Sequence, residues 1–126
     1  MTFRAPWIAN IDDLDDVIDR SERLPFRFVF EHGSLQAGIY MPGEDDNQRP
    51  HNRDEAYVVM AGSGHVIVEG ERVPCRTGDF IFVPAHAEHR FEDYTPDLAL
   101  WVLFYGPEGG EEQDNSDENG RAASAN

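Results

Sequence analysis

From Pro25 onward, the hydrophobic and polar positions follow the pattern of a β protein. Short segments rich in Val, Ile, Phe and Tyr are separated by Gly, Pro and Asp, which is typical of strands joined by tight turns. We interpret as strands the residues 26–32, 35–41, 56–62, 65–71, 72–75, 79–85, 89–94 and 98–106. Hairpin turns are expected at 62–64 (GSG) and 69–72 (EGER). Because hardly any helix fits between these strands, the pattern favours an all-β antiparallel sandwich or barrel over an α/β sheet.

One segment before Pro25 has a helical period instead. The apolar residues that share one face of a helix over 11–20 are Ile11, Leu14, Val17 and Ile18. Asn10 is suited to cap this helix, and its aspartates lie on the opposite face, where the early ones complement the helix dipole. We therefore predict a short solvated helix, rather than a carboxylate metal site, within an N-terminal arm of residues 1–24.

After Tyr105 the composition changes again. Residues 107–126 are acidic and small, with almost no apolar side chain to bury, so we predict a disordered acidic tail; an acidic segment that binds a partner is the alternative. The remaining residues, 25–106, then form the folded barrel. A chain of 126 residues suffices for one domain with a real core but is too short for two.

Charge and cysteine content limit the classes of partner that the protein can bind and indicate the cellular compartment in which it is found. The net charge is −15 and all ten basic residues are arginine, so the basic footprint of a nucleic-acid or anionic-lipid partner is missing. Solvation or a salt-adapted host explains this acidity more simply than an acidic docking surface. No run approaches the roughly 18 apolar residues of a membrane span, and the N-terminus lacks the pattern of a secretion signal. With Cys75 as the only cysteine, we expect a cytoplasmic protein without an intrachain disulfide.

Three residues could form a metal site. If the chain is extended from His51 onward, His51 and Glu55 point to one face of a strand. A second segment adds His89, which follows a proline-marked turn and opens another predicted strand. Two imidazoles and one carboxylate would make a facial triad of metal ligands. The alternative is a histidine and a glutamate exposed at a strand edge.

Two spaced motifs give this constellation a family context. The first motif comprises Gly43, Arg49, His51, Glu55 and Gly62. The second motif comprises Gly78, Pro84, His86, His89 and Asp93. Over residues 35–105 this pattern resembles the two motifs of the cupins. Three positions depart from the family pattern: Arg49 replaces the first histidine, His86 a glycine and Asp93 an asparagine.

The resemblance implies a small cupin jelly roll, the double-stranded β-helix, with a metal inside the barrel. His51, Glu55 and His89 match three of the four usual cupin ligands. This donor set suits a divalent metal such as Fe(II), Mn(II), Zn(II), Co(II) or Ni(II). Arg49 cannot ligate, so the fourth position is open to water and substrate, or Gln48 replaces it through a register shift, or metal binding is lost.

Other residues are candidates for contact with a ligand. If Arg49 faces the pocket, its fork suits a substrate carboxylate or phosphate; the alternative is an ion pair at the rim with Glu44, Asp45 or Asp46. The aromatic residues that we expect in the barrel wall, or simply in its core, are Tyr40, Tyr57, Phe82, Phe91 and Trp101. His86 could line the mouth or act as a proton carrier, or it simply fills the turn before His89; His86 or Tyr57 could act as acid or base.

The resemblance thus implies a metal-dependent enzyme that acts on a small organic molecule, and Arg49, if it faces the pocket, favours an anionic one. Cupins include dioxygenases, isomerases and lyases, and the facial triad slightly favours oxygen chemistry. A non-catalytic cupin that binds a small ligand is the alternative. A homodimer that pairs through a sheet is expected by analogy with the family.

Overall fold

The computed structural model describes residues 6–46 and 48–112 of the chain. This part contains eight strands and one short helix, joined by turns and loops. Their bounds are η1 (Ile11–Val17), β1 (Phe26–His32), β2 (Leu35–Tyr40), β3 (Asp54–Ala61), β4 (Ser63–Val68), β5 (Glu71–Arg76), β6 (Phe80–Val83), β7 (His89–Glu92) and β8 (Ala99–Tyr105). Each segment predicted as a strand overlaps one of these eight strands. Most of the predicted disordered tail, residues 113–126, lies outside the described residues.

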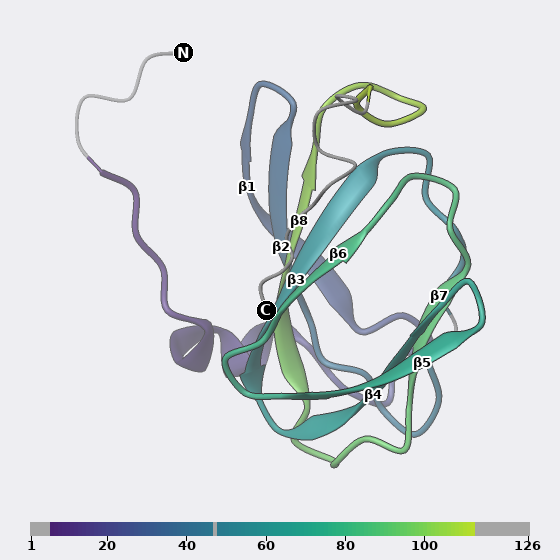
Figure 1. Ribbon diagram of the computed structural model, residues 1–126. Coiled ribbons are helices and arrows are strands. Elements are labelled where there is room, and N and C mark those ends of the chain that lie inside the picture. The colour runs from purple at the N-terminus through teal and green to yellow at the C-terminus, as the bar shows by residue number, and fades with distance from the viewer. Residues whose placement is uncertain (1–5, 47, 113–126) are drawn as a thin grey trace.

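The strands form two antiparallel sheets. The larger sheet has the order β1-β2-β8-β3-β6, and the smaller sheet has the order β5-β4-β7 (Figure 1). The last strand, β8, lies between β2 and β3, so the chain returns to the middle of the larger sheet after it has built the smaller one. This arrangement confirms the predicted all-β, double-sheet jelly roll.

The core between the sheets is built by alternation along the strands. Tyr57 and Val59 of β3, together with Leu100 and Val102 of β8, are buried there at 0–2% exposure. Phe91 of β7 closes the core from the smaller sheet. Because successive side chains of a strand point to opposite faces, this register also fixes which residues face outward.

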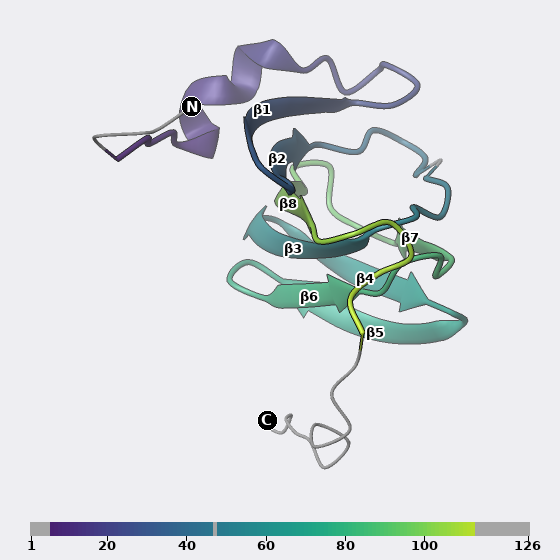
Figure 2. The same ribbon diagram turned by 90° about the horizontal axis from the view of Figure 1, so that it is seen from above.

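The N-terminal segment covers part of the outer face of the larger sheet. Ile11 and Ile18 are buried in a second cluster with Ile39, Met41 and Ala99. Figure 2 shows η1 beside β1 and β2, at the opposite end of the molecule from β5. The outer face of β2 and β8 is therefore apolar as well.

The predicted helix over 11–20 is shorter than expected and is a 3-10 helix that ends at Val17. Ile18 is already extended, with φ −123° and ψ 132°, and its side chain turns into the second cluster. Aspartate and β-branched residues favour the α-helix weakly, so packing of the two isoleucines decides the local structure. The cap is as predicted, because the Asn10 side chain accepts a hydrogen bond from the Asp12 N–H at 2.9 Å. No helix within 6–46 and 48–112 has the length and apolar character to span a membrane.

Candidate metal centre

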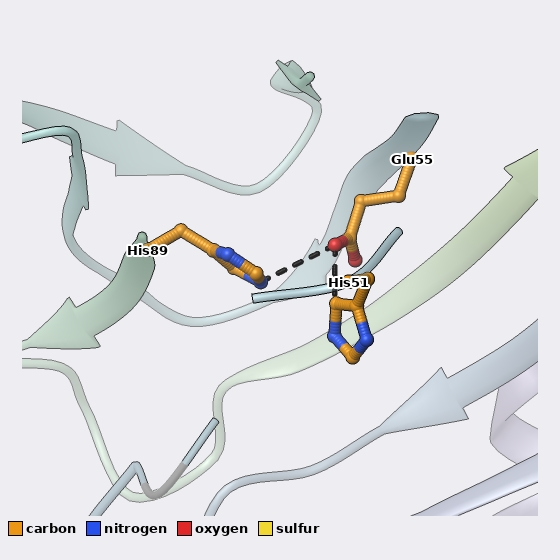
Figure 3. A group of neighbouring side chains, drawn as sticks. All are labelled: His51, Glu55 and His89. Carbon is orange, nitrogen blue, oxygen red and sulfur yellow. Dashed lines mark ion pairs between the residues drawn. The ribbon is translucent and has the colours of Figure 1, made fainter. Parts of the chain in front are cut away.

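His51, Glu55 and His89 meet inside the barrel. His51 lies in the loop before β3, Glu55 is the second residue of β3, and His89 opens β7. Glu55 Oε1 lies 3.2 Å from His89 Nε2 and 3.7 Å from His51 Nε2 (Figure 3). One possible ligand atom from each residue lies within 4.8 Å of the others. The structure thus brings together the three residues of the predicted triad.

The position of His51 differs from the expectation, because β3 begins only at Asp54. A loop, rather than a strand, carries the imidazole. Its backbone is fixed from a second loop, since the His51 carbonyl accepts a hydrogen bond from the His86 N–H at 2.5 Å. The imidazole also contacts the edge of Phe104, with ring centroids 5.0 Å apart. Tertiary contacts therefore place this side chain where strand alternation was expected to place it.

His89 presents a lone pair to Glu55. Its Nδ1 lies 2.9 Å from the Ala87 carbonyl, which can only accept, so Nδ1 carries the hydrogen and Nε2 of the neutral ring is an acceptor. Both oxygens of Glu55 and Nε2 of His89 are buried and have no aligned hydrogen-bond partner among the described residues. Leaving such groups unpaired is costly, and a divalent cation would satisfy all of them. A backbone carbonyl that orients a ligating imidazole is typical of metal sites. The donor set therefore fits a metal.

The two histidines differ in their affinity for protons. Burial lowers the pKa of His51 by more than the nearby Glu55 raises it, so His51 stays neutral and ready to ligate. Burial also lowers the pKa of His89, but Glu55 and the Ala87 carbonyl together outweigh burial and raise it. Without a metal, a proton on His89 therefore compensates the buried charge of Glu55.

A cavity of about 650 Å³ opens beside His51 and Glu55. Its lining residues are Arg23, Leu24, Phe26, Phe28, Tyr40, Gln48, Arg49, His51, Glu55, Val102 and Phe104. The wall is largely apolar, with polar groups at a few positions, as small-molecule sites usually are. His51 and Glu55 belong to this wall, so a metal on them would lie next to a bound ligand.

A hydrogen-bonded chain crosses the barrel beside the triad. The Tyr57 hydroxyl donates to the Gln48 side-chain oxygen at 2.7 Å, and the Gln48 amide donates to Asp46 at 2.9 Å. Asp46 also accepts from the Tyr40 hydroxyl at 2.5 Å and from the Phe91 N–H at 2.7 Å. The side-chain oxygen of Gln48 is thus engaged by a tyrosine, which argues against its replacing the missing ligand. Asp46 was not predicted as a site residue, because it belongs to neither motif and its partner on β7, the Phe91 N–H, lies 45 residues away in the sequence.

Arg49 lines the cavity, and in the described part of the chain it forms no ion pair with Glu44, Asp45 or Asp46. This favours the pocket-facing alternative over the rim. A second arginine, Arg23, lines the same cavity. Sequence reasoning missed it because it lies in the turn before β1, outside both motifs.

Comparison with known proteins assigns the family. The sequence profile described as "Cupin domain" matches residues 38–105, which is more than half of the 126 residues. The chain belongs to the cupin domain family. An uncharacterized protein of Streptomyces coelicolor is 30% identical over 100 residues, which cover 78% of this chain and 94% of that protein.

Solved structures with a similar barrel belong to proteins of different kinds. A cupin 2 conserved barrel domain protein of Salinispora arenicola is 16% identical with a TM-score of 0.62, covering 82% of this cupin and 91% of that chain. A protein of Ralstonia eutropha, described as a candidate mannose-6-phosphate isomerase, is 21% identical with a TM-score of 0.63, covering 81% of this chain and 100% of that one. The DMSP lyase DddQ of Ruegeria pomeroyi is 26% identical with a TM-score of 0.58, covering 67% of this chain but only 47% of the lyase. The fold is shared among them, and their activities differ.

Two predicted wall residues lie on the outside of the cupin barrel. Phe82 is 48% exposed, because its neighbour Val83 takes the inward position opposite Glu55 on β6. Trp101 packs against the outer cluster under η1, since Leu100 and Val102 on either side of it face inward. Neither aromatic residue lines the cavity, so both predictions are corrected.

The remaining predicted residues divide between cavity and core. Tyr40 lines the cavity, whereas Tyr57 and Phe91 are buried in the core with their rings 5.2 Å apart, edge to face. His86 is exposed and has a positive φ of 70°. Its side chain does not line the cavity, so the prediction of a residue at the cavity mouth is corrected. What His86 contributes is the backbone hydrogen bond that holds His51.

Proposed function

We propose that this cupin is a metal-dependent enzyme that acts on a small organic anion. One divalent ion, chosen from Fe(II), Mn(II), Zn(II), Co(II) and Ni(II), would be held by His51, Glu55 and His89. The observation that carries the proposal is the convergence of three ligand atoms within 4.8 Å, where the buried Glu55 oxygens and His89 Nε2 have no aligned partner among the described residues.

The residues around the triad have separate parts in the proposed chemistry. A divalent ion would supply Lewis-acid polarisation of a substrate oxygen, and Fe(II) would add dioxygen chemistry. Arg49 offers a planar fork to the anionic group of the substrate, and the apolar wall excludes water from the reacting end. Burial, with a smaller contribution from Glu55, raises the pKa of Tyr57 well above its usual range. Its phenol therefore keeps its proton at neutral pH and donates a hydrogen bond to the Gln48 side-chain oxygen, so we assign Tyr57 the part of positioning Gln48 at the cavity rather than that of an acid or base.

We place dioxygenase chemistry first and isomerase or lyase chemistry second. Two histidines and one carboxylate form the ligand set of the non-heme iron oxygenases, in which the other coordination positions remain for substrate and oxygen. Arg49, which stands where the family has a further histidine, cannot close such a position. Oxygen uptake by the anaerobically iron-loaded protein, presented with a panel of small organic acids, tests this order. Conversion by the zinc or manganese form without oxygen uptake would reverse it.

A non-catalytic cupin that only binds a ligand is the second candidate, and the loss of one family ligand at Arg49 favours it. The two candidates differ in turnover. If the metal-loaded protein binds an organic acid without changing it, as followed by NMR with each of the five ions, the enzyme proposal is wrong. A His89→Ala variant, lacking the metal, serves as the control for adventitious conversion.

We also propose that two copies pair through the outer face of β3 and β6. Phe80 is 68%, Phe82 48% and Met60 39% exposed there, and β6 is the edge strand of the larger sheet. A net charge of −15 repels two copies everywhere except across an uncharged face, which makes this face the favoured contact. Light scattering of wild type and Phe80→Ser tests it, and a wild-type monomer would contradict it. A cytoplasmic location stays a prediction.

A further inference from the structure

We infer that the cavity takes a carboxylic acid with an apolar body, aromatic or branched, whose carboxylate is held jointly by Arg23 and Arg49. This rests on the proposed function, since it names the substrate class of the same site. The inference adds a second arginine, Arg23 of the N-terminal segment, to the proposed anion site. It also specifies the chemical character of the rest of the ligand.

The charges of these two arginines are available to a ligand. Most other arginines of the described chain are engaged, three by carboxylates and two by backbone carbonyls: Arg27, Arg72 and Arg90, then Arg20 and Arg53. Arg23 and Arg49 are exposed, and neither forms an ion pair or side-chain hydrogen bond with the residues that the structure describes, although the chain carries a net charge of −15. Unpaired cations at one cavity in so acidic a chain indicate an anionic ligand.

The segment that carries Arg23 is anchored on both sides. Before Arg23, Arg20 donates to the Leu98 carbonyl at 2.7 Å. After it, Arg27 pairs with Glu22 at 2.8 Å, so an ion pair closes the turn 22–27 that contains Arg23. Arg23 and Leu24 of this turn line the cavity. The approach of Arg23 is therefore built into the fold rather than left to a free arm.

Aromatic rings form a further part of the cavity wall. Phe26 lies edge-on against Phe28 at 4.8 Å and against Phe104 at 6.4 Å between ring centroids, and Phe28 lies 6.0 Å from Phe104. Such a cluster offers rings and methyl groups a matching surface. A sugar phosphate, which is anionic but covered with hydroxyls, would leave those hydroxyls without partners against this wall. The apolar acid is thus favoured over the polyhydroxylated one.

Charge also sets the orientation of the acid. Among the residues that line the cavity, Arg23 and Arg49 carry a permanent positive charge, whereas His51 and Glu55 mark the end of the cavity next to the triad. The ligand carboxylate is therefore drawn to the arginines rather than to the triad. The apolar body then spans the aromatic wall, with its far end directed toward the triad.

Calorimetric titration of the metal-free protein tests the inference without any need for activity. The probes are phenylacetate, 3-phenylpropanoate and 4-methylpentanoate, the neutral matched alcohol 3-phenylpropan-1-ol, and mannose 6-phosphate. We expect at least one acid to bind about ten-fold or more tightly than the alcohol, and mannose 6-phosphate not to bind measurably. Binding of acid and alcohol with equal affinity, tighter binding of the sugar phosphate, or no binding by any acid at about 10 mM would overturn it.

Variants assign the effect to the two arginines. Arg23→Gln and Arg49→Gln should each weaken binding of the acid roughly ten-fold to hundred-fold and leave the affinity for the alcohol unchanged. Arg76→Gln is the matched control, because Arg76 is an exposed arginine that does not line this cavity. An equal loss of affinity for the acid in Arg76→Gln, or no loss in Arg23→Gln, would contradict joint binding of the carboxylate by Arg23 and Arg49. If the acids bind but no metal does, the enzyme proposal fails and this inference stands; if metal binds but no acid does, the reverse holds.

Discussion

His89 Nε2 lies 3.2 Å from Glu55 Oε1, and both side chains are 1% exposed. With its Nδ1 committed to the Ala87 carbonyl, the neutral imidazole presents an acceptor to a carboxylate that can only accept. A cation must stand between them, and it is either a proton or a metal. Because a proton and a metal compete for this position, the stability of the protein, its pH dependence and its metal content should be linked.

Glu55→Gln should separate the buried charge from the metal. The amide places a donor near His89 Nε2 and removes a buried carboxylate, so we expect the metal-free variant to unfold with a free energy equal to wild type or about 1 kcal/mol higher. Wild type should gain about 2.7 kcal/mol from metal at 100 times its dissociation constant, and the variant should gain none. Denaturant titrations with and without metal measure both. Glu44→Gln, at an exposed carboxylate, is the control, and a variant that keeps the metal-induced gain would contradict the ligand set.

Metal affinity should rise with pH. The folded-state pKa of His89 is raised above the usual value, so its proton stabilises the metal-free fold fully below about pH 6.5 and this stabilisation is lost as pH rises through the folded pKa. The lowered pKa of His51 acts in the opposite sense, because that contribution is present above about pH 6.5 and is lost as pH falls.

A metal must therefore displace the proton of His89 but meets a His51 that is already neutral. Calorimetric titrations in buffers of different ionisation enthalpy should show protons released on metal binding, and this release should decrease as pH rises through the folded-state pKa of His89. An affinity that is constant between about pH 6 and 8 would contradict this relationship.

Asp46 should matter for stability more than its sequence suggests. Its carboxylate accepts from the Phe91 N–H, the Tyr40 hydroxyl and the Gln48 amide, so Asp46→Ala leaves part-buried donors without a partner. We expect a loss of about 2–3 kcal/mol in the free energy of unfolding. Asp45→Ala, at the exposed neighbouring carboxylate, should change it by less than about 0.5 kcal/mol. Equal effects of the two substitutions would disprove the bracing role.

The metal triad could be predicted from sequence because its spacing is local. Glu55 and His89 project from the strands that their motifs predict, and the order of the motifs places both in one barrel. His51 keeps its place in the motif but reaches the site from a loop that the His86 N–H holds. Arg23 and Asp46 had no such signal. Arg23 lines the cavity because the fold brings the turn before β1 to it, and Asp46 is tied to β7 by the Phe91 N–H, 45 residues away in the sequence. Spacing within a motif does not encode such contacts.

The errors at the aromatic residues have a different cause. Strand β8 is apolar on both faces because η1 covers its outer side, so composition could not tell inward Val102 from outward Trp101. On β6 the largest side chains, Phe80 and Phe82, face outward and the smaller Val83 faces in. Size and hydrophobicity led to the opposite expectation for Phe82.

Two phenylalanines with opposite orientation test this assignment of faces. Phe91→Ala should cost about 3–5 kcal/mol, because the 2%-exposed ring fills the core against Tyr57. Phe82→Ala, at a ring on the outer face, should cost less than about 1 kcal/mol. Urea unfolding of both variants gives the comparison, and a cost at Phe82 that equals the cost at Phe91 would mean that β6 is turned the other way.

The central claim is the metal, and elemental analysis of protein purified without chelator or affinity-tag metal tests it most directly. Wild type should carry about one divalent ion per chain, and His51→Ala and His89→Ala should lose it while remaining folded. Arg76→Gln should keep it. Full occupancy in His89→Ala, or no metal in wild type after reconstitution with each of Fe(II), Mn(II), Zn(II), Co(II) and Ni(II), would contradict the account.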